Sequence, residues 1–253
     1  MSDIKLGFWE TMKNGIRHHL QHDNINNFLN WGELQSTMIA HVQNIEYTYL
    51  ISDNRWELWK DKISETKFKP NSHPICNESS ENNLHHAYSL QILMEQTGHK
   101  LNEFDTIVEF GGGYGNVCRL FKRWGHDKPY YTYDIPELIQ IQKHYLKEND
   151  VVDNVHFMEE LDAIESVIGN SLFLGMWSIS EVPIEERARL LDNLKFFDCK
   201  NIFIAMGGMF KNENNMKWLQ EVIIPRLTSL GHEHKIIKIE HGKDMFYFVA
   251  TKK

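Results

Sequence analysis

The stretches IVEFGGGYG, residues 107–115, and YTYDIP, residues 131–136, decide the fold of this chain. Each is a short run of β-branched and aromatic residues with an acidic residue near its end, Glu109 in the first and Asp134 in the second. Glycines that follow a strand let the backbone turn sharply and approach a ligand, and the next helix offers unpaired N–H groups there. The pattern therefore predicts a ligand-binding turn between a strand and a helix.

The identity of that ligand follows from the acidic residues. The dinucleotide fingerprint GxGxxG requires a glycine at position 116, which is Asn116, and the GKS or GKT of a Walker A loop is absent. A carboxylate does not help to bind phosphate, but it attracts a cation. S-adenosylmethionine carries a sulfonium and an amino group, and Asp134 stands where a carboxylate accepts both ribose hydroxyls. A competing interpretation makes Glu109 a solvated strand end and the glycines a simple turn.

From Phe104 onward, strand-like runs alternate with amphipathic stretches, as in a parallel α/β sheet. The expected strands are 106–110, 130–134, 154–158, 171–177 and 201–206. The expected helices are 115–124, 137–147, 160–168, 184–197 and 214–230. The chain ends in HKIIKIEHGKDMFYFVATKK, two strand-like runs without a helix between them. This predicts a mostly parallel, Rossmann-like sheet that is closed by an antiparallel C-terminal hairpin.

Residues 1–103 lack this alternation of strands and helices. We expect them to form a helical N-terminal cap that binds the acceptor, and residues 104–253 to form the sheet domain. The expected helices are 5–20, 26–43, 45–63 and 82–97, with Ser80 as the N-cap of the last one. Residues 69–83 predict an ordered loop. Trp56 and Trp59 could stack on the face of a sugar or a nucleobase, but their three-residue spacing favours side chains that anchor a helix in the core.

Composition narrows the class of protein. The chain has 253 residues, 42% of them hydrophobic, and a net charge of -8 from 27 basic and 35 acidic side chains. Because no half of the chain is basic, nucleic acid is not expected as a partner. Three cysteines lie far apart, and neither a signal peptide nor a run of about 20 apolar residues is present. We therefore expect a cytosolic protein with reduced thiols and no membrane insertion.

The segments VEFGGGYGNVCRLFK and YDIPELIQIQKHYL resemble a family of sugar O-methyltransferases from bacterial surface-polysaccharide clusters. This family is a branch of the class I S-adenosylmethionine-dependent methyltransferases. The resemblance is clear over residues 104–183 and continues weakly through the C-terminal hairpin. It implies a methyl transfer from S-adenosylmethionine, with S-adenosylhomocysteine as product, to a hydroxyl of a sugar or nucleotide sugar.

The resemblance also implies roles for individual residues. Those expected to bind the methionine part are Glu109, Gly111, Gly112, Gly113 and Tyr114. Asp134 would bind the ribose, with Ile135 beside the adenine and Met158 and Glu159 at its edge. Trp177 and Ser178 would line the place where donor and acceptor meet.

An alcohol acceptor must lose its proton, which calls for a general base. The candidates are His85, His86 and Glu181; at most one of the two adjacent histidines is expected to reach the site. Either histidine could instead serve packing, and Glu181 could cap the next helix or pair with Arg187. Arg119 and Arg123 could meet a phosphate or face solvent. No metal is expected, because no third ligand follows His18 and His22 at suitable spacing.

Several alternatives stay open at this point. The acceptor could be a small phosphorylated or phosphoramidate-type capsule precursor. A nicotinamide-dependent sugar enzyme is disfavoured by Asn116 and by the C-terminal hairpin. A non-catalytic binding protein with a methyltransferase fold is a third candidate, and a homodimer is one candidate assembly.

Overall fold

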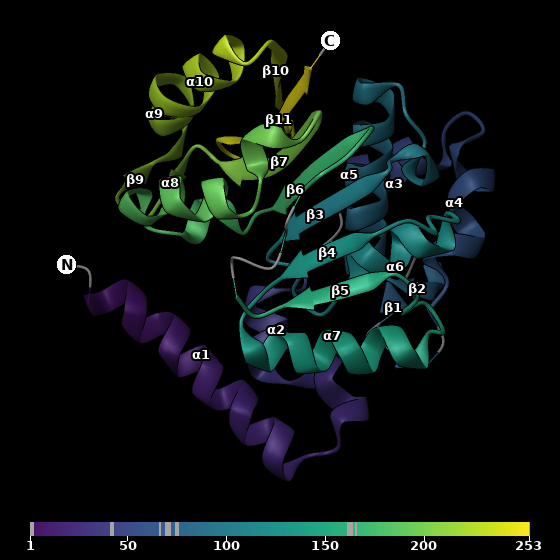
Figure 1. Ribbon diagram of the computed structural model, residues 1–253. Helices are drawn as coiled ribbons and strands as arrows, with labels where there is room; N and C mark the ends of the chain where they lie inside the picture. The colour runs from purple at the N-terminus through teal and green to yellow at the C-terminus, as the bar shows by residue number, and fades with distance from the viewer. Residues whose placement is uncertain are drawn as a thin grey trace. The chain divides into compact units, whose positions relative to one another are not determined.

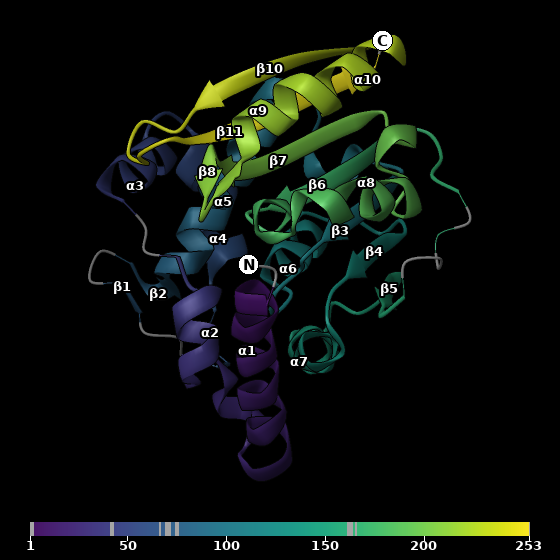
Figure 2. The same cartoon turned by 90° about the vertical axis from the view of Figure 1, so that its left-hand side faces the viewer.

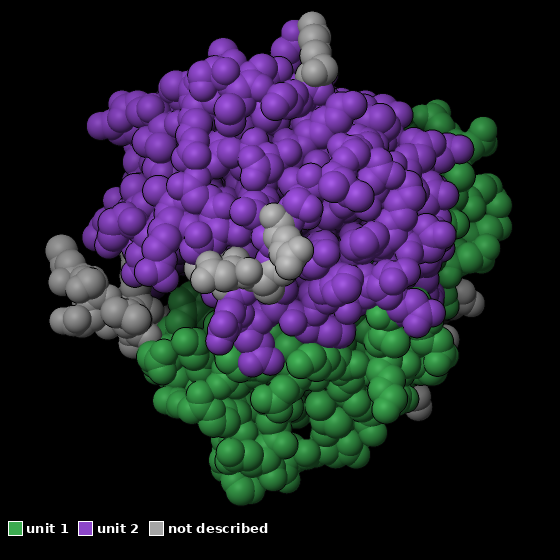
Figure 3. Space-filling model, viewed as in Figure 1, with its two compact units in different colours: residues 1–89, 113–120, 135–152 green, residues 90–112, 121–134, 153–253 purple. Residues whose placement is uncertain are grey.

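The computed structural model describes residues 3–40, 43–65, 67–68, 72–73, 76–160, 164 and 166–252. These residues form two compact units, which Figure 3 shows in different colours. Unit 1 consists of residues 1–89, 113–120 and 135–152, and unit 2 of residues 90–112, 121–134 and 153–253. The chain thus passes between the units several times, and the domain boundary at residue 103 stays a prediction.

Unit 2 is built on a seven-stranded sheet with the order β10-β11-β7-β6-β3-β4-β5 (Figure 1). The strands are β3 (Thr106–Phe110), β4 (Tyr130–Tyr133), β5 (Val155–Met158), β6 (Ser171–Met176), β7 (Asn201–Gly207), β10 (His232–Lys238) and β11 (Met245–Lys252). Strands β3 to β7 pair in parallel, whereas β11 runs antiparallel between β7 and β10. All five predicted parallel strands and the antiparallel closing hairpin are confirmed.

Helices of unit 2 that follow β6 and β7 in the chain pack against one face of this sheet. These are α8 (Ile184–Asn193), α9 (Asn215–Trp218) and α10 (Ile224–Ser229), with a π-helical turn at Leu219–Ile223 before α10 (Figure 2). Leu191, Leu219 and Leu227 from these helices join Phe173 and Phe248 from the sheet in one buried cluster. Burying such side chains stabilises the unit by about 1.5–3 kcal/mol each.

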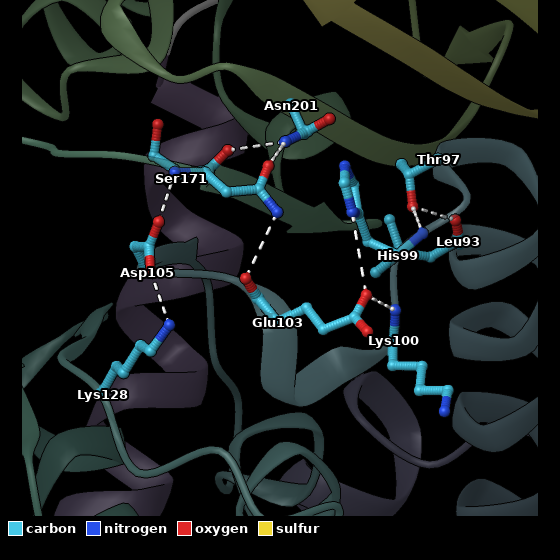
Figure 4. A network of polar contacts seen from close by, with 10 residues as sticks. Leu93, Thr97, His99, Lys100, Glu103, Asp105, Lys128, Ser171 and Asn201 are labelled. Carbon is cyan, nitrogen blue, oxygen red and sulfur yellow. Dashed lines mark hydrogen bonds and ion pairs between the residues drawn. The ribbon is translucent and has the colours of Figure 1, made fainter.

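The amino ends of the parallel strands are fixed by a polar network (Figure 4). The Asp105 carboxylate accepts hydrogen bonds from Lys128 at 2.5 Å and from the Asn170 backbone at 2.7 Å. Asn201 donates to the Asn170 side chain at 2.8 Å and to the Ser171 carbonyl at 3.1 Å. This network joins the starts of β3, β6 and β7, so it supports the sheet at the end opposite to the glycine turn.

Unit 1 is mainly helical. It contains α1 (Asp3–His22), the 3-10 helix Ile25–Asn30, α2 (Gly32–Thr37), α3 (Asn44–Ile51), α4 (Arg55–Ile63), the first part of α5 (Glu81–Thr97), the start of α6 (Asn116–Arg123) and α7 (Pro136–Glu148). Arg17 of α1 bonds the Glu137 carboxylate of α7 at 2.5 Å. As predicted, Ser80 caps α5, because its hydroxyl accepts from the Asn83 N–H at 3.2 Å.

Two of the expected helices of this unit are divided. The helix at 45–63 breaks at Ser52–Asn54, where Asp53 adopts a φ of 51°. Polar residues in such a run bond their own backbone and favour a turn over a helix. The helix at 26–43 breaks at Trp31, which is extended with φ -71° and ψ 136°; residues 41 and 42 lie outside the described part.

Two further predictions are wrong for the residues that the structure describes. Residues 160, 164 and 166–168 are not helical, and 161–163 and 165 lie outside the described residues. Ile164 is buried in the unit 2 cluster but Ile168 is 65% exposed, so their spacing is not that of a buried helix face. The expected loop at 69–83 contains two antiparallel strands, β1 (Ser72–His73) and β2 (Cys76–Ser80), while residues 69–71, 74 and 75 are not described.

Candidate functional site

The glycine turn begins where β3 ends. Gly111 has a φ of 74°, and its N–H donates to the Tyr133 carbonyl of β4 at 2.8 Å. A Cβ added at Gly111 would lie 2.2 Å from the Cβ of Ser178, which follows β6. Only glycine combines this backbone conformation with so close an approach. The turn therefore lies against the loop that leaves β6.

The loop after β6 is held by its own hydroxyl groups. Ser178 Oγ donates to the Phe110 carbonyl at 2.5 Å, and Ser180 Oγ donates to the Trp177 carbonyl at 2.5 Å. Trp177 has a φ of 69°, a strained conformation for a non-glycine residue of the kind that clusters at functional sites. The predicted residues Trp177 and Ser178 thus lie beside the glycine turn, with the Ser178 hydroxyl bonded to the end of β3.

Glu109 lies inside β3 and is 1% exposed. Tyr130 of β4 donates its hydroxyl to Glu109 Oε2 at 2.9 Å. Burial raises the pKa of the Glu109 carboxyl to about 7; the Tyr130 hydrogen bond opposes this shift and the negative charge of Asp134 adds to it. The carboxyl is therefore close to its ionisation point at neutral pH. A cation bound nearby would favour its charged form.

Asp134 is the next residue after β4, and its backbone N–H donates to the Met158 carbonyl at 3.4 Å. Phe110 pairs with Tyr133 and Tyr133 pairs with Met158, so β3, β4 and β5 end side by side. The structure thus brings Glu109, Gly111, Asp134 and Met158 together at the carboxyl ends of neighbouring parallel strands. This is where ligands bind in open α/β sheets. Gly112 lies in the turn after Gly111, and Glu159 is exposed just beyond β5.

Three of the predicted donor residues belong to unit 1. The Gly113 carbonyl accepts from Gln142 Nε2 at 3.0 Å, and Ile135 is the N-cap residue of α7. Tyr114 is 2% exposed, and its hydroxyl accepts from Asn82 Nδ2 at 2.9 Å. Burial raises the pKa of the Tyr114 hydroxyl well above its usual value. Tyr114 is thus part of the unit 1 core, and its role in donor binding stays a prediction.

His85 lies on α5 and is 7% exposed. Its Nδ1 lies 2.8 Å from Oε1 of Glu46, a carboxylate on α3 with 0% exposure. Glu46 is not among the site residues predicted from the sequence. Its only local signal is a capping box at the start of α3, in which Gln43 and Glu46 bond each other's backbone N–H.

His86 has a different environment from its neighbour. Its Nδ1 lies 2.8 Å from Nδ2 of Asn116 on α6. Burial is the main cause that lowers the pKa of His86 to about 3, and the positive charges of His85 and Arg119 contribute. His86 is therefore neutral at physiological pH and a weak proton acceptor.

Arg119 is fully buried in the same unit, so neither of its predicted roles, phosphate contact or solvent exposure, is correct. Its guanidinium donates to Asn116 Oδ1 at 3.2 Å, to the Ser64 carbonyl at 3.1 Å and to Asn83 Oδ1 at 2.7 Å. Asn83 in turn donates to the buried Glu65 carboxylate at 2.5 Å. Arg123, the last residue of α6, is half-buried.

Glu181 ends a short 3-10 helix, Ile179–Glu181, after β6. Burial raises the pKa of its carboxyl to about 7, against the lowering effect of Lys211. Arg187 donates to the carbonyls of Val182 at 2.8 Å and Ser180 at 3.1 Å instead of pairing with Glu181. Helix α8 has no side-chain N-cap. Glu181 is therefore not observed to cap α8 or to pair with Arg187, and it stays a candidate base.

The two tryptophans Trp56 and Trp59 have structural roles. Trp59 is 0% exposed and Trp56 packs edge-on against Tyr47, which confirms the interpretation of Trp59 as a core anchor.

His18 and His22 lie with ring centroids 4.5 Å apart on α1. Within the described residues, no group of three or more His, Cys, Asp or Glu could hold a metal ion. In the same part of the chain, no helix combines the length and apolar character needed to cross a bilayer.

Comparison with known proteins gives the fold. No protein-family model and no curated protein matches the chain. A structure of magnesium protoporphyrin IX methyltransferase from Synechocystis PCC 6803 with bound SAH is 12% identical, with a TM-score of 0.50, over 83% of this chain and 98% of that one. The Pnkp1/Rnl/Hen1 RNA repair complex is 15% identical, also with a TM-score of 0.50, over 64% of this chain and 40% of that one. Together with the sheet order, the likeness shows that the chain shares a Rossmann-like fold with this methyltransferase structure.

Proposed function

We propose that this protein is an S-adenosylmethionine-dependent O-methyltransferase that acts on a sugar hydroxyl, free or nucleotide-linked, in the synthesis of a bacterial surface polysaccharide. The observation that carries the donor assignment is that Glu109, in the turn-side part of β3, and Asp134, directly after β4, lie toward the same end of two adjacent parallel strands, beside the turn at Gly111. The acceptor class is supported by the family resemblance of residues 104–183.

The residues of this site suit a cationic nucleoside. A Cβ at Gly111 would meet Ser178, so only glycine lets the turn pack this closely against the loop after β6. Glu109 is buried with a pKa raised by that burial to about 7, and an ammonium or sulfonium nearby would stabilise its charged form. Asp134 carries the carboxylate for the ribose hydroxyls. When bound, S-adenosylmethionine supplies a methyl group activated by its sulfonium.

The protein must align the acceptor with the methyl group and remove the proton of the acceptor hydroxyl. Holding the acceptor oxygen in line with the methyl group and sulfur contributes up to roughly 7–11 kcal/mol to catalysis. A general base must take the hydroxyl proton, and the candidates are His85, His86 and Glu181. Of these, the lowered pKa of His86, caused mainly by burial, makes it the weakest base.

Calorimetric titration with S-adenosylmethionine and S-adenosylhomocysteine tests the donor assignment. We expect Asp134→Ala to weaken donor binding by about 1–3 kcal/mol through the loss of charge-assisted hydrogen bonds. Asp127→Ala is the matched control, because it removes the same charge from the exposed segment before the amino end of β4. Equal affinity of the Asp134 variant and wild type would remove the ribose role of Asp134.

A second experiment addresses the acceptor. Transfer of radiolabelled methyl from S-adenosylmethionine is measured with nucleotide sugars, sugar phosphates, free sugars and a phosphoramidate. We expect turnover with a sugar hydroxyl, and its loss in Asp134→Ala at donor concentrations below saturation. Transfer to the phosphoramidate alone would replace the sugar by that precursor. Donor binding without any transfer would favour a binding protein, and tight binding of NADH would favour an oxidoreductase.

A further inference from the structure

A cavity of about 270 Å³ lies in unit 2, where the chain leaves β7. After β7 the chain forms a small hairpin, β8 (Met209–Phe210) and β9 (Glu213–Asn214), and enters α9, which lies against β8 (Figure 2). The residues that line the cavity include Met209, Asn214, Met216, Lys217, Gln220 and Asp244. Asp244 precedes β11, whose first residue Met245 pairs with Gly207 at the end of β7. The cavity therefore lies at the sheet edge that carries the proposed donor residues.

The loop after β6 connects the cavity to the glycine turn within unit 2. Strand β8 lies against the 3-10 helix Ile179–Glu181 of this loop. Ser178, just before that helix, contacts the turn at Gly111. Neighbouring strands are about 4.8 Å apart, so the ends of β3 and β7, with β6 between them, are separated by about 10 Å. A small acceptor bound in the cavity is thus within reach of the donor turn.

Glu181 has one neighbour in the loop and one in the hairpin that fix its surroundings. Arg187 donates to the carbonyls of Ser180 and Val182, on either side of Glu181, at 3.1 Å and 2.8 Å. Burial raises the pKa of the Glu181 carboxyl and the charge of Lys211, just after β8, lowers it, so the hairpin lies near this carboxyl. The Arg187 guanidinium also packs 4.6 Å from the ring centroid of Trp218 on α9. One buried side chain thus ties the Glu181 loop to a helix that lines the cavity.

The Asp244 carboxylate is held in place while its oxygens stay available. The Gly208 N–H donates to the Asp244 backbone carbonyl at 2.6 Å. A Cβ added at Gly208 would lie 2.5 Å from Oδ2 of Asp244, so the carboxylate lies directly beside this glycine. Within the part of the chain that the structure describes, neither the Asp244 carboxylate nor the Gln220 amide forms a hydrogen bond. Both are free to bind a ligand.

The cavity combines hydrogen-bonding groups of both kinds with apolar surface. Asp244 accepts hydrogen bonds, and Gln220 both donates and accepts. Asn214 caps α9 through its side-chain oxygen, so its Nδ2 is the atom that it offers as a donor. Met209 and Met216 add adaptable apolar side chains. Such a lining suits a ring that carries hydroxyls on its rim and C–H groups on its faces.

Charge and size favour a neutral ring over a phosphate or a whole nucleotide. Lys217 is the one basic residue that lines the cavity, and its Nζ lies 3.9 Å from a carboxylate oxygen of Glu221. Asp244 balances its charge, so no cluster of cations is present to bind a phosphate. The volume of about 270 Å³ is just below the roughly 300–1,000 Å³ of ordinary small-molecule sites, which suits one sugar ring.

We propose that this cavity is the acceptor subsite and binds one neutral sugar ring, whose hydroxyls donate to the Asp244 carboxylate. This inference rests on the proposed function and deepens it. A nucleotide attached to the sugar lies outside the cavity. Of the candidate bases His85, His86 and Glu181, only Glu181 belongs to the same unit as the cavity and Gly111. The reactive hydroxyl lies on the side of the ring that faces Glu181.

Methionine NMR tests the cavity in the whole protein. Protein labelled with carbon-13 at its methionine methyl groups is saturated with S-adenosylhomocysteine and titrated with the sugar that accepts methyl groups in the transfer assay. We expect the signals of Met209 and Met216, assigned with their leucine variants, to shift, and that of Met94 on α5, which does not line the cavity, to stay. Methyl transfer to a sugar that moves neither cavity signal would overturn this assignment and leave the proposed function intact.

Turnover tests the role of Asp244. We expect Asp244→Asn to raise KM for the sugar about tenfold and to change affinity for S-adenosylhomocysteine less than twofold. Asparagine tolerates the φ of 59° at this position, so the turn before β11 is kept. Asp153→Asn is the matched control, because Asp153 is exposed before the amino end of β5, at the opposite edge of the sheet. Wild-type KM in Asp244→Asn would refute the role of Asp244.

Two further variants separate the position of the carboxylate from the charge of the cavity. Gly208 does not have a positive φ, so Gly208→Ala should fold, displace the Asp244 carboxylate and raise KM while the charge is unchanged. Lys217→Gln should raise KM less than Asp244→Asn does. The reverse order would identify an anionic ligand and overturn the neutral ring. If wild type transfers a methyl group to no sugar, the proposed function fails and the cavity assignment falls with it.

Discussion

The ionisation of one buried carboxyl group, Glu109, should affect both the stability of the fold and the binding of a cationic ligand. Burial raises its pKa from 4.5 to about 7, so in the folded protein without ligand it holds its proton up to neutral pH. The unfolded chain releases that proton at lower pH. The stability that Glu109 contributes is therefore complete below about pH 4.5 and is lost as the pH rises through about 7.

Glu109→Gln should make stability less dependent on pH, because glutamine does not ionise. Relative to wild type, we expect the variant to gain about 3 kcal/mol in the free energy of unfolding between pH 4.5 and pH 8. Urea denaturation of both proteins at pH 4.5, 6 and 8 measures this difference. A difference that stays constant over this range would show that Glu109 has the same pKa in the folded and the unfolded protein.

The pH dependence of donor binding should also reveal the ionisation of Glu109. A cationic ligand stabilises the charged form of Glu109, so binding near pH 7 should release a proton. We expect affinity for S-adenosylmethionine to rise roughly tenfold or more between pH 5.5 and pH 8, and Glu109→Gln to abolish most of this rise. Calorimetry in buffers of different ionisation enthalpy counts the protons released. Proton uptake, or none, would contradict the assignment.

At the scale of secondary-structure elements, the glycine turn and the loop after β6 depend on each other. Gly111→Ala places a Cβ 2.2 Å from that of Ser178 and forces a φ of 74° on alanine. Gly125→Ala is the matched control: its φ is 86°, but no atom lies within 4 Å of the added Cβ. We expect the control to cost about 1–2 kcal/mol in the free energy of unfolding.

The Gly111 variant should cost more than the control, because the contact with Ser178 adds to the backbone strain. Chemical denaturation measures both variants, and donor titration should show weaker binding only for Gly111→Ala. Ser178→Gly removes the opposing Cβ, so in a double-mutant cycle it should recover part of the loss. Equal costs for the two glycine variants would mean that the contact is not formed in solution.

The sequence predicted the strands better than the helices. Strands β3, β6 and β7 are buried throughout nearly all their length, so they read as continuous apolar runs between turn residues. The helix expected at 160–168 failed because apolar residues at helical spacing there do not share a buried face. The breaks at Trp31 and Asp53 arise from backbone conformations that apolar periodicity does not encode.

For the site, the sequence indicated the donor residues but not the partners of the histidines. Glu109, Gly111 and Asp134 follow one another within two adjacent βα units, so their spacing along the chain reveals them. Glu46 reaches His85 across 39 residues, and Asn116 reaches His86 across 30. Such contacts depend on the packing of helices in unit 1, for which no local sequence signal exists.

At the scale of the whole sheet, the antiparallel strand β11 is an interior element and β10 is an edge. Phe248 of β11 pairs directly with Ile236 of β10, yet Phe248 is 0% exposed and Ile236 is 39% exposed. We expect Phe248→Ala to lower the free energy of unfolding by about 3–5 kcal/mol. Ile236→Ala should cost clearly less, because its side chain is partly solvated in the folded state. Denaturation followed by tryptophan fluorescence compares the two, and equal costs would place the edge of the sheet elsewhere.

A crystal structure of the protein with S-adenosylhomocysteine bound is the most direct test of the central claim, that an adenosine derivative is held by acidic residues at the ends of neighbouring parallel strands. We predict that the ribose hydroxyls bond the Asp134 carboxylate, and that the homocysteine part lies along the turn at Gly111 with its ammonium on the side of Glu109. A ligand bound away from Glu109 and Asp134 would contradict this account.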